Sequence, residues 1–221
     1  MKKLASILVI IMVLISCNQE TKNHSTKDNA KSGEPKAQKT EKQLWTLDAD
    51  QSSVHWTGYK TTKMVPVSGE FKSFEITGVK PYADMLATLK NARIRIKVAS
   101  IFSSNEDRDS KLVEYLFGKM MQTNDIYARV EGIDVKNQQI KLNINMNNHE
   151  KVVPMNYNID TEKGTITMEG KIDLVKDFDA GEPLYFFHTA CEDKHKGEDG
   201  VSKTWSEVGI KAVIKYTNSN K

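Results

Sequence analysis

The second half of the chain alternates apolar and polar side chains with a period of two. In residues 93–98 (RIRIKV), every second side chain is aliphatic and the intervening ones are basic. Successive side chains of a strand point to opposite faces of a sheet, so this pattern predicts a strand with one buried face. The same alternation occurs in residues 140–146, 153–159, 166–172 and 208–216.

Less regular apolar segments predict further strands, at residues 53–59, 65–71, 74–79 and 126–135. Turn-rich breaks separate several of the segments, as expected for antiparallel hairpins. So many one-sided strands would leave exposed edges in an open sheet, and closure into a barrel removes those edges. We therefore predict an all-β fold, a single antiparallel β-barrel of about eight strands with one or two short helices.

Two segments interrupt the strand pattern. Residues 109–117 (DSKLVEYLF) place four apolar side chains at helical spacing after Asp109. Aspartate accepts backbone N–H bonds at helix N-termini, so a short helix capped by Asp109 is predicted. Residues 180–191 contain Leu184 and three consecutive aromatic residues, and they predict either a second helix or a lid.

After Met1 the chain has two lysines and an apolar run of 12 residues, 4–15. A membrane-spanning helix needs about 20 apolar residues, so the run predicts a signal peptide. Residues 14–17 (LISC) are typical of a bacterial lipobox, which predicts cleavage before Cys17 and stable anchoring by acyl chains on that cysteine. The alternative is an incidental Cys17 in an ordinary secretory signal or a poor membrane anchor.

Asn18 bears on the destination of the protein. Aspartate at this position would argue for retention in the inner membrane. By resemblance to Gram-negative lipoproteins, Asn18 therefore favours the outer membrane over the inner one, with the protein facing the periplasm.

Composition divides the chain into four parts. We expect a signal peptide at 1–16, a lipidated cysteine with a disordered tether at 17–43, the barrel at 44–217 and a tail at 218–221. After Cys17, the tether has no aromatic residue and no aliphatic one larger than alanine. It cannot bury enough apolar surface to offset the entropy of ordering. The barrel region is long enough for one domain with a substantial core.

Charge and cysteine content exclude some classes of protein. The formal charge of +3 includes two signal-peptide lysines, so the mature chain carries about +1. No basic excess remains to suggest a nucleic-acid partner. Once Cys17 is acylated, Cys191 is the only thiol left, and no internal disulfide is possible. Stability must therefore come from a hydrophobic core.

Residues 98–117, which begin VASIFSSNEDRDSKL, resemble the central motif of the YceI-like family: a strand ending in Ser-Ile, a polar loop, an Arg-Asp pair, then Leu and Phe on a short helix. Residues 45–48 (WTLD), 53–56 (SVHW), 67–71 (VSGEF) and 208–210 (VGI) agree in order and spacing.

The end of the domain extends this resemblance. Cys191 and residues 200–205 (GVSKTW) are similar to lipoprotein members of the family from Bacteroidetes-like bacteria. The resemblance implies an extended antiparallel barrel similar to lipocalins, whose pore binds a polyisoprenoid or another long amphiphilic lipid. An eight-stranded barrel is about wide enough inside for side chains or one small ligand.

The apolar strand faces can be interpreted in two ways: they fill the core completely, or they line a lipid pocket. Large residues near barrel ends and lids are the best candidates for an elongated pocket. The predicted ligand-binding residues are Trp56, Tyr59, Phe71, Phe74, Ile94, Ile96, Val98, Arg108, Leu112, Leu116, Phe117, Leu142, Ile144, Phe186 and Ile210.

Arg108 is the one charged residue in this set. Its guanidinium could clamp a phosphate or carboxylate head group with two hydrogen bonds. The alternative, which we favour, is that Arg108 and Asp109 form a salt bridge or cap that fixes the loop across the barrel mouth.

One cluster resembles a metal site. His188, Cys191, Asp193 and His195 are spaced so that several could share one face of a helix. A lone thiol in an oxidising compartment is a poor lasting ligand, so a buried Cys191 with solvated histidines is the expected arrangement, and no metal or other cofactor is predicted.

No phosphate-binding glycine loop, nucleophile elbow or zinc-protease helix occurs in the sequence, so we predict no enzymatic activity. The leading function is membrane-anchored lipid binding. The alternatives are an envelope stress or interaction module with a filled barrel, and a protein that binds metal through His188, Cys191 and His195. Exposed strand edges near Pro154 could also pair two chains, so a homodimer is a further alternative.

Overall fold

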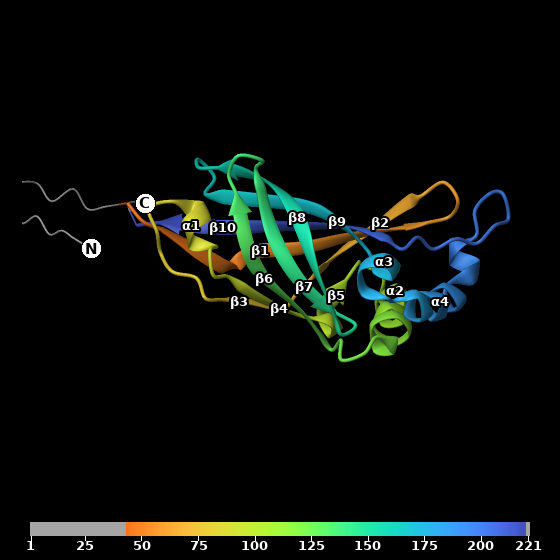
Figure 1. Cartoon of the computed structure of the whole chain (residues 1–221). Coiled ribbons are helices and arrows are strands. Elements are labelled where there is room, and N and C mark those ends of the chain that lie inside the picture. The colour runs from red at the N-terminus through yellow and green to blue at the C-terminus, as the bar shows by residue number, and fades with distance from the viewer. Residues whose placement is uncertain (1–42, 220–221) are drawn as a thin grey trace, which may run out of the picture. The chain divides into compact units, whose positions relative to one another are not determined.

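The computed structural model describes residues 43–219, which form one antiparallel sheet of ten strands (Figure 1). The strands are β1 (Trp45–Lys60), β2 (Val65–Phe71), β3 (Phe74–Thr77), β4 (Arg93–Lys97), β5 (Ile101–Phe102), β6 (Asp125–Asp134), β7 (Gln139–Met146), β8 (His149–Asp160), β9 (Thr165–Asp173) and β10 (Glu207–Asn218). Their order in the sheet is β3-β4-β6-β7-β8-β9-β10-β1-β2-β5. Four of the five segments that alternate most regularly form β7 to β10 in the middle of the sheet, whereas the fifth forms β4, next to its edge.

Alternation separates the two faces of the sheet. In β7, Leu142 and Ile144 are buried in the core, whereas Lys141 is exposed on the opposite face. Across β7 and β8, Leu142 pairs with Val153, another core residue. This register keeps apolar side chains on one face of the sheet, as the sequence predicts.

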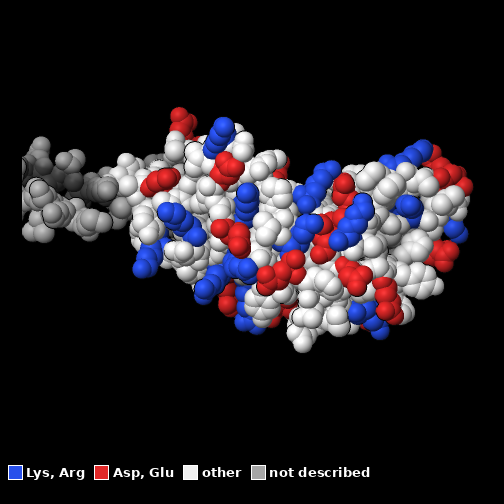
Figure 2. All heavy atoms as spheres, viewed as in Figure 1, with Lys and Arg blue, Asp and Glu red and all other residues white. Residues whose placement is uncertain are grey.

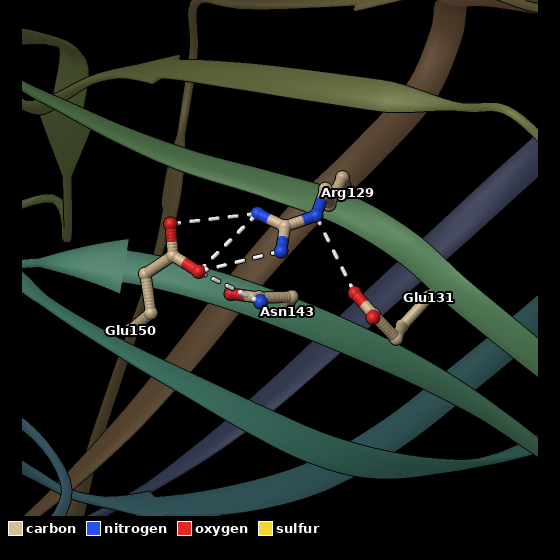
Figure 3. Close-up of polar contacts among 4 residues, drawn as sticks. All are labelled: Arg129, Glu131, Asn143 and Glu150. Atoms are coloured by element: carbon tan, nitrogen blue, oxygen red, sulfur yellow. Dashed lines mark hydrogen bonds and ion pairs between the residues drawn. The ribbon is translucent and has the colours of Figure 1, made fainter.

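The outer face of the same strands carries a polar network (Figure 3). Arg129 Nη2 lies 3.3 Å from Glu150 Oε2, and Arg129 Nε lies 3.4 Å from Glu131 Oε2. Asn143 donates a hydrogen bond from Nδ2 to Glu150 Oε2 at 2.9 Å. Hydrogen bonding by Asn143 and Arg129 lowers the pKa of Glu150. Polar pairs of this kind suit the solvated face of an antiparallel sheet.

The two ends of the sheet meet at a corner. Lys72 and Ser73 interrupt the chain between β2 and β3, and a 3-10 turn, η1 (Val98–Ser100), interrupts it between β4 and β5. The Lys72 N–H donates to Ser100 O, and the Lys97 N–H donates to Ser73 O, both at 3.0 Å. The sheet thus curls into a half-barrel, which confirms the predicted lipocalin-like antiparallel fold. The sheet has ten strands rather than about eight: each of the nine segments with a strand pattern forms a strand, and β5, with two residues, is too short to show a pattern.

A short helix, α1 (Met85–Thr88), packs at one end of the half-barrel. Thr88 Oγ1 lies 3.0 Å from Tyr216 Oη, and Tyr216 Oη donates to Met85 O at 3.3 Å. Burial raises the pKa of Tyr216 to about 12. Leu44 and Ser219, near the two ends of the described chain, are hydrogen-bonded to each other beside this end (Figure 1).

The remaining helices gather at the opposite end (Figure 1). They are α2 (Glu106–Lys111), the π-turn η2 (Leu112–Leu116), the 3-10 turn η3 (Phe117–Lys119), α3 (Leu174–Phe178), α4 (Gly181–Ala190) and the 3-10 turn η4 (Glu192–His195). The segment left open as helix or lid is therefore helical as α4. Among the described helices, none has the length and apolar character needed to cross a membrane.

The predicted cap by Asp109 is wrong. The helix begins earlier, because the side chain of Asn105 accepts the Arg108 N–H at 2.9 Å and serves as the N-cap. Asp109 lies inside α2, and its carboxylate accepts the Ser103 N–H at 3.0 Å. The apolar residues after it do pack inward, but on the π-turn η2, where Leu112 and Leu116 are buried.

Candidate functional site

A cavity of about 610 Å³ extends from the inside of the half-barrel to the helical end. It has two parts. We define the barrel section by lining residues of the strands: Ile94, Ile126, Ala128, Leu142, Ile144, Met168, Ile210, Ala212 and Ile214. We define the basic section by lining residues at the helical end: Lys60, Asn105, Asp107, Arg108, Lys111, Lys194, His195 and Thr204. Asn105, Asp107 and Lys194 are exposed, so the cavity reaches solvent at the basic section.

The empty space in the barrel section results from small side chains as well as from the alternation of apolar residues. Ala128 and Ala212 stand at inward positions where larger side chains would fill the space. Trp56 on β1 faces Gly69 on β2, and a Cβ at Gly69 would lie 2.5 Å from Trp56 Cζ2. The glycine therefore lets the indole lie against the wall. Within the described residues, buried Trp56 Nε1 has no hydrogen-bond partner.

Most residues predicted to bind the ligand line this one cavity. They are Trp56, Tyr59, Phe71, Ile94, Ile96, Arg108, Leu112, Leu116, Phe117, Leu142, Ile144 and Ile210. They come from strands β1, β2, β4, β7 and β10 and from α2, η2 and η3. Contact between these residues and a lipid stays a prediction.

The placement of Phe186 on the pocket wall is wrong. One face of α4 carries Leu184 and Phe187, and Cys191 at the C-cap continues this face; all three line the cavity at the three- and four-residue spacing of a helix. Phe186 lies off this face and is 37% exposed. Its ring packs edge-on against Tyr185, and Lys119 Nζ lies 5.5 Å from the ring centroid.

Phe74 and Val98 also lie off the cavity lining. Phe74 is partly buried and packs on the core, opposite Ile96 in the β3–β4 pair. Val98 is buried on η1, because the strand ends at Lys97 rather than continuing. Both residues stand next to the corner where β2 passes into β3 and β4 into β5. They fill that corner rather than the cavity wall.

Several lining residues were not predicted. Lys60 Nζ donates to Lys194 O at 3.1 Å, although the two residues are 134 positions apart. Trp205 Nε1 donates to Thr61 O at 2.7 Å and brings the loop before β10 to the β1–β2 turn. No local pattern signals such contacts. Met155 and Met168 also line the cavity, and their alternating positions could have identified them.

Arg108 and Asp109 both hold the preceding loop. Arg108 donates from Nε to Ser103 Oγ at 2.8 Å and from Nη2 to Ser103 O at 2.7 Å. Asp109 accepts hydrogen bonds from the backbone and the hydroxyl group of the same serine. The favoured role in fixing the loop is therefore present, although as hydrogen bonds to Ser103 rather than as a salt bridge or cap. Arg108 also lines the cavity.

The His188 to His195 segment forms a hydrogen-bonded cluster at Thr204. His188 Nδ1 and His195 Nδ1 lie 3.0 and 2.6 Å from Thr204 Oγ1. Burial, reinforced by the positive charge of Lys60, lowers the pKa of His195 to about 4. Burial raises the pKa of the Cys191 thiol. Within residues 43–219, no three His, Cys, Asp or Glu side chains are grouped so that they could hold a metal ion.

A curled antiparallel sheet around a largely apolar cavity, with most of its helices at one end, is a lipocalin-like fold. The chain belongs to the YceI-like family, since the profile of the YceI-like domain matches residues 45–214. No curated protein sequence matches it significantly.

Two solved structures share the fold. A polyisoprenoid-binding domain from Saccharophagus degradans, implicated in plant cell wall breakdown, is 15% identical, with a TM-score of 0.55, over 78% of this chain and 97% of that domain. BcnA of Burkholderia cenocepacia is 17% identical, with a TM-score of 0.52, over 76% of this chain and 98% of BcnA.

Proposed function

We propose that this protein binds a polyisoprenoid or a similar long-chain amphiphile in its cavity and performs no catalysis. The observation that carries the proposal is the cavity itself. Protein interiors contain few voids larger than a water molecule, so a space of about 610 Å³ lined by aliphatic residues is not ordinary packing. Its volume falls within the range of about 300–1,000 Å³ that is usual for ligand sites. The cavity favours lipid binding over the filled-barrel alternative.

The chemistry of the barrel section fits a hydrocarbon chain. Leu142, Ile144 and Ile214 line the section and are buried within the fold. Burial of apolar surface contributes roughly 25 cal/mol per Å², and a long chain offers much such surface. The fold shared with the polyisoprenoid-binding domain of Saccharophagus degradans supports the same class of ligand.

Extraction of the purified protein with organic solvent, followed by mass spectrometry, tests the proposal. A stoichiometric polyprenyl or other long-chain species is expected. Ala212→Phe places a ring in the barrel section, so this variant should carry at least tenfold less lipid. Val213→Ile is the matched control, because Val213 is the next residue on β10 and does not line the cavity.

The two variants also give the outcomes that would contradict the proposal. A clean extract from the wild-type protein would do so directly. Equal lipid content in the wild type, Ala212→Phe and Val213→Ile would show that any extracted lipid binds outside the cavity.

We further propose that Cys17 anchors the protein to a membrane, the outer membrane rather than the inner, with the barrel facing the periplasm. Cys17, the signal peptide and nearly all of the tether lie outside the described residues. The proposal is supported by the LISC pattern at residues 14–17. In cell fractionation, Cys17→Ala should move the protein from the membrane to the soluble periplasmic fraction. Unchanged membrane association would contradict the anchor.

A further inference from the structure

Four large apolar side chains are exposed at the helical end of the half-barrel. Tyr185 is 64% exposed and Met121 is 57% exposed, and Val175 and Phe186 are exposed as well. They belong to α3, α4 and the segment after η3, which lie at this end (Figure 1). We call these four residues the apolar patch. Single apolar residues are common on protein surfaces, whereas a group of them marks an interaction surface.

Three residues of the patch lie together on α3 and α4. The rings of Tyr185 and Phe186 pack edge-on, with their centroids 6.1 Å apart. Gly181, at the start of α4, is beside Val175, since a Cβ on this glycine would lie 3.8 Å from Val175 Cγ1. The two helices therefore present their apolar side chains on adjoining parts of the surface.

The segment after η3 adds the fourth residue. The Met121 N–H donates to Asn147 Oδ1 at 2.7 Å, and Asn147 Nδ2 donates to Phe178 O at 2.8 Å, which places Met121 near the end of α3. On η3 itself, Lys119 Nζ lies 5.5 Å from the ring centroid of Phe186. The patch thus extends from α3 and α4 to the neighbouring η3 segment.

The charged side chains around the patch are mixed in sign. Lys119 and Lys176 are exposed beside it, and so are Asp179 and Glu182. Figure 2 shows the same mixture of basic and acidic side chains over the visible face of the described residues. Neither sign predominates near the patch, so its apolar side chains rather than its charge determine what it binds.

Helix α4 separates the apolar patch from the cavity. Its inward face carries Leu184 and Phe187, which line the cavity, and its outward face carries Tyr185 and Phe186. The opening of the cavity, at the basic section, lies at the same helical end of the half-barrel. A surface in contact with the patch would therefore lie next to the cavity and its opening.

The length of chain before the described residues suits contact with a membrane. The described chain begins beside α1, at the other end of the half-barrel (Figure 1). About 25 residues separate Cys17 from it, and a segment of this length spans at most about 80–90 Å. The longest strand, β1, has 16 residues and a length of about 50 Å. A chain anchored at Cys17 is therefore long enough for the helical end to reach the bilayer.

We infer that the apolar patch docks on the surface of a lipid bilayer, with Tyr185 and Phe186 inserted among the head groups. The inference rests on the proposed function, since docking brings the opening of the cavity to a source of lipid. Aromatic and aliphatic side chains on one face of a helix insert at this depth, and a nearby lysine such as Lys119 keeps its ammonium group in the head-group layer. Apolar burial drives the contact, so anionic lipids are not required.

Sedimentation with phosphatidylcholine vesicles tests the inference. The mature chain, residues 17–221, is prepared with Cys17→Ala, so that neither the signal peptide nor an acyl anchor contributes to binding. This chain is expected to bind the vesicles. Addition of Tyr185→Ser and Phe186→Ser should reduce the partition coefficient at least about tenfold, because two large rings no longer leave water.

Tyr82→Ser combined with Val135→Ser is the matched control. Both residues are exposed, and they again pair an aromatic with a second apolar side chain. Tyr82 bridges Trp45 near α1, and Val135 lies in the turn between β6 and β7, so neither belongs to the helical end. The control should bind vesicles as the Cys17→Ala chain does.

The ionic strength of the solution provides a second measurement, which needs no substitution in the patch. Binding of the Cys17→Ala chain should change by less than about twofold from low to high salt, because salt screens charges and does not weaken apolar burial. Replacing part of the phosphatidylcholine with phosphatidylglycerol should have an equally small effect. This measurement keeps the inference falsifiable if the patch variant fails to fold.

Each contrary result has its own meaning. Equal binding by the patch variant and the control, or binding that high salt abolishes, would overturn docking through the patch. If the patch substitutions converted a dimer into a monomer in analytical ultracentrifugation, the patch would be a contact between two copies of the chain, and docking would be rejected. Lipid in the organic extract without any vesicle binding would reject docking alone, whereas a clean extract would overturn the proposed function.

Discussion

The barrel section and the basic section of one cavity arise from different kinds of sequence information. In the barrel section, Leu142 and Ile144 lie inward because they alternate with polar residues on their own strand. In the basic section, Lys60 meets Lys194 across 134 positions of sequence. Periodicity therefore builds a wall for a hydrocarbon chain, whereas contacts between distant loops and helices provide the charge at its opening.

The two sections also differ in how much the stability of the fold depends on them. Residues of the barrel section belong to the hydrophobic core, so a change there alters both the fold and the binding surface. Several residues of the basic section are partly or fully exposed, and the fold depends on them less. Substitutions in the basic section can therefore change the charge at the opening of the cavity while the half-barrel keeps its fold.

The largest expected effect is on stability, when an aspartate is introduced into each of the two sections in turn. Ile144→Asp places a carboxyl group in the apolar barrel section and should lower the free energy of unfolding by at least about 4 kcal/mol. Lys194→Asp places it at an exposed position beside Lys60 and should change stability by less than about 0.5 kcal/mol. Urea denaturation measures both. A loss below about 1 kcal/mol for Ile144→Asp would show that the barrel section is hydrated, and the contrast would fail.

The next effect depends on His195, which is buried in the basic section. Its pKa is about 4 in the folded protein against 6.5 for a free histidine. Between these values the unfolded chain binds a proton that the folded one does not. Stability is therefore complete above about pH 6.5, falls as the pH drops toward 4, and is lower by at most about 3 kcal/mol at the end of this range.

Denaturation curves from pH 4 to 7 measure this dependence, and His195→Gln serves as the comparison. The variant should lose the part of the slope that His195 contributes. Identical slopes for wild type and variant would show that His195 is accessible to protons in the folded state, and the basic section would then be less closed than the structure indicates.

Much of the fold could be predicted from sequence, for a physical reason. The segments 140–146, 153–159, 166–172 and 208–216 all lie within observed strands, because their side-chain period matches the geometry of a strand with one buried face. β5 was missed because two residues cannot show a period. The N-cap was placed at Asp109 because both Asn105 and Asp109 can cap a helix, and only the bond to the Arg108 N–H distinguishes them.

The candidate site was predictable to the extent that it is built from strands. Ile94, Leu142 and Ile210 were found by alternation and line the cavity. Phe186 was placed on its wall because a run of three aromatic residues does not reveal which one faces inward, and the helix turns Phe187 inward instead. Lys60 and Lys194 carried no signal, because a lysine at a strand end or in a short 3-10 turn is ordinarily solvated.

The smallest expected effect lies at the end of the half-barrel where α1 packs, opposite the helical end that holds the basic section. Tyr216→Phe removes the hydroxyl group that bonds Thr88 and Met85 and should cost about 1 kcal/mol, or about 2–4 °C in melting temperature. Tyr185→Phe is the matched control, because Tyr185 is 64% exposed and should show almost no change. Scanning calorimetry measures both. Neither Tyr216 nor α1 lines the cavity, so Tyr216→Phe should leave the lipid content of the purified protein unaltered. A changed lipid content would show that this end of the half-barrel is coupled to the cavity.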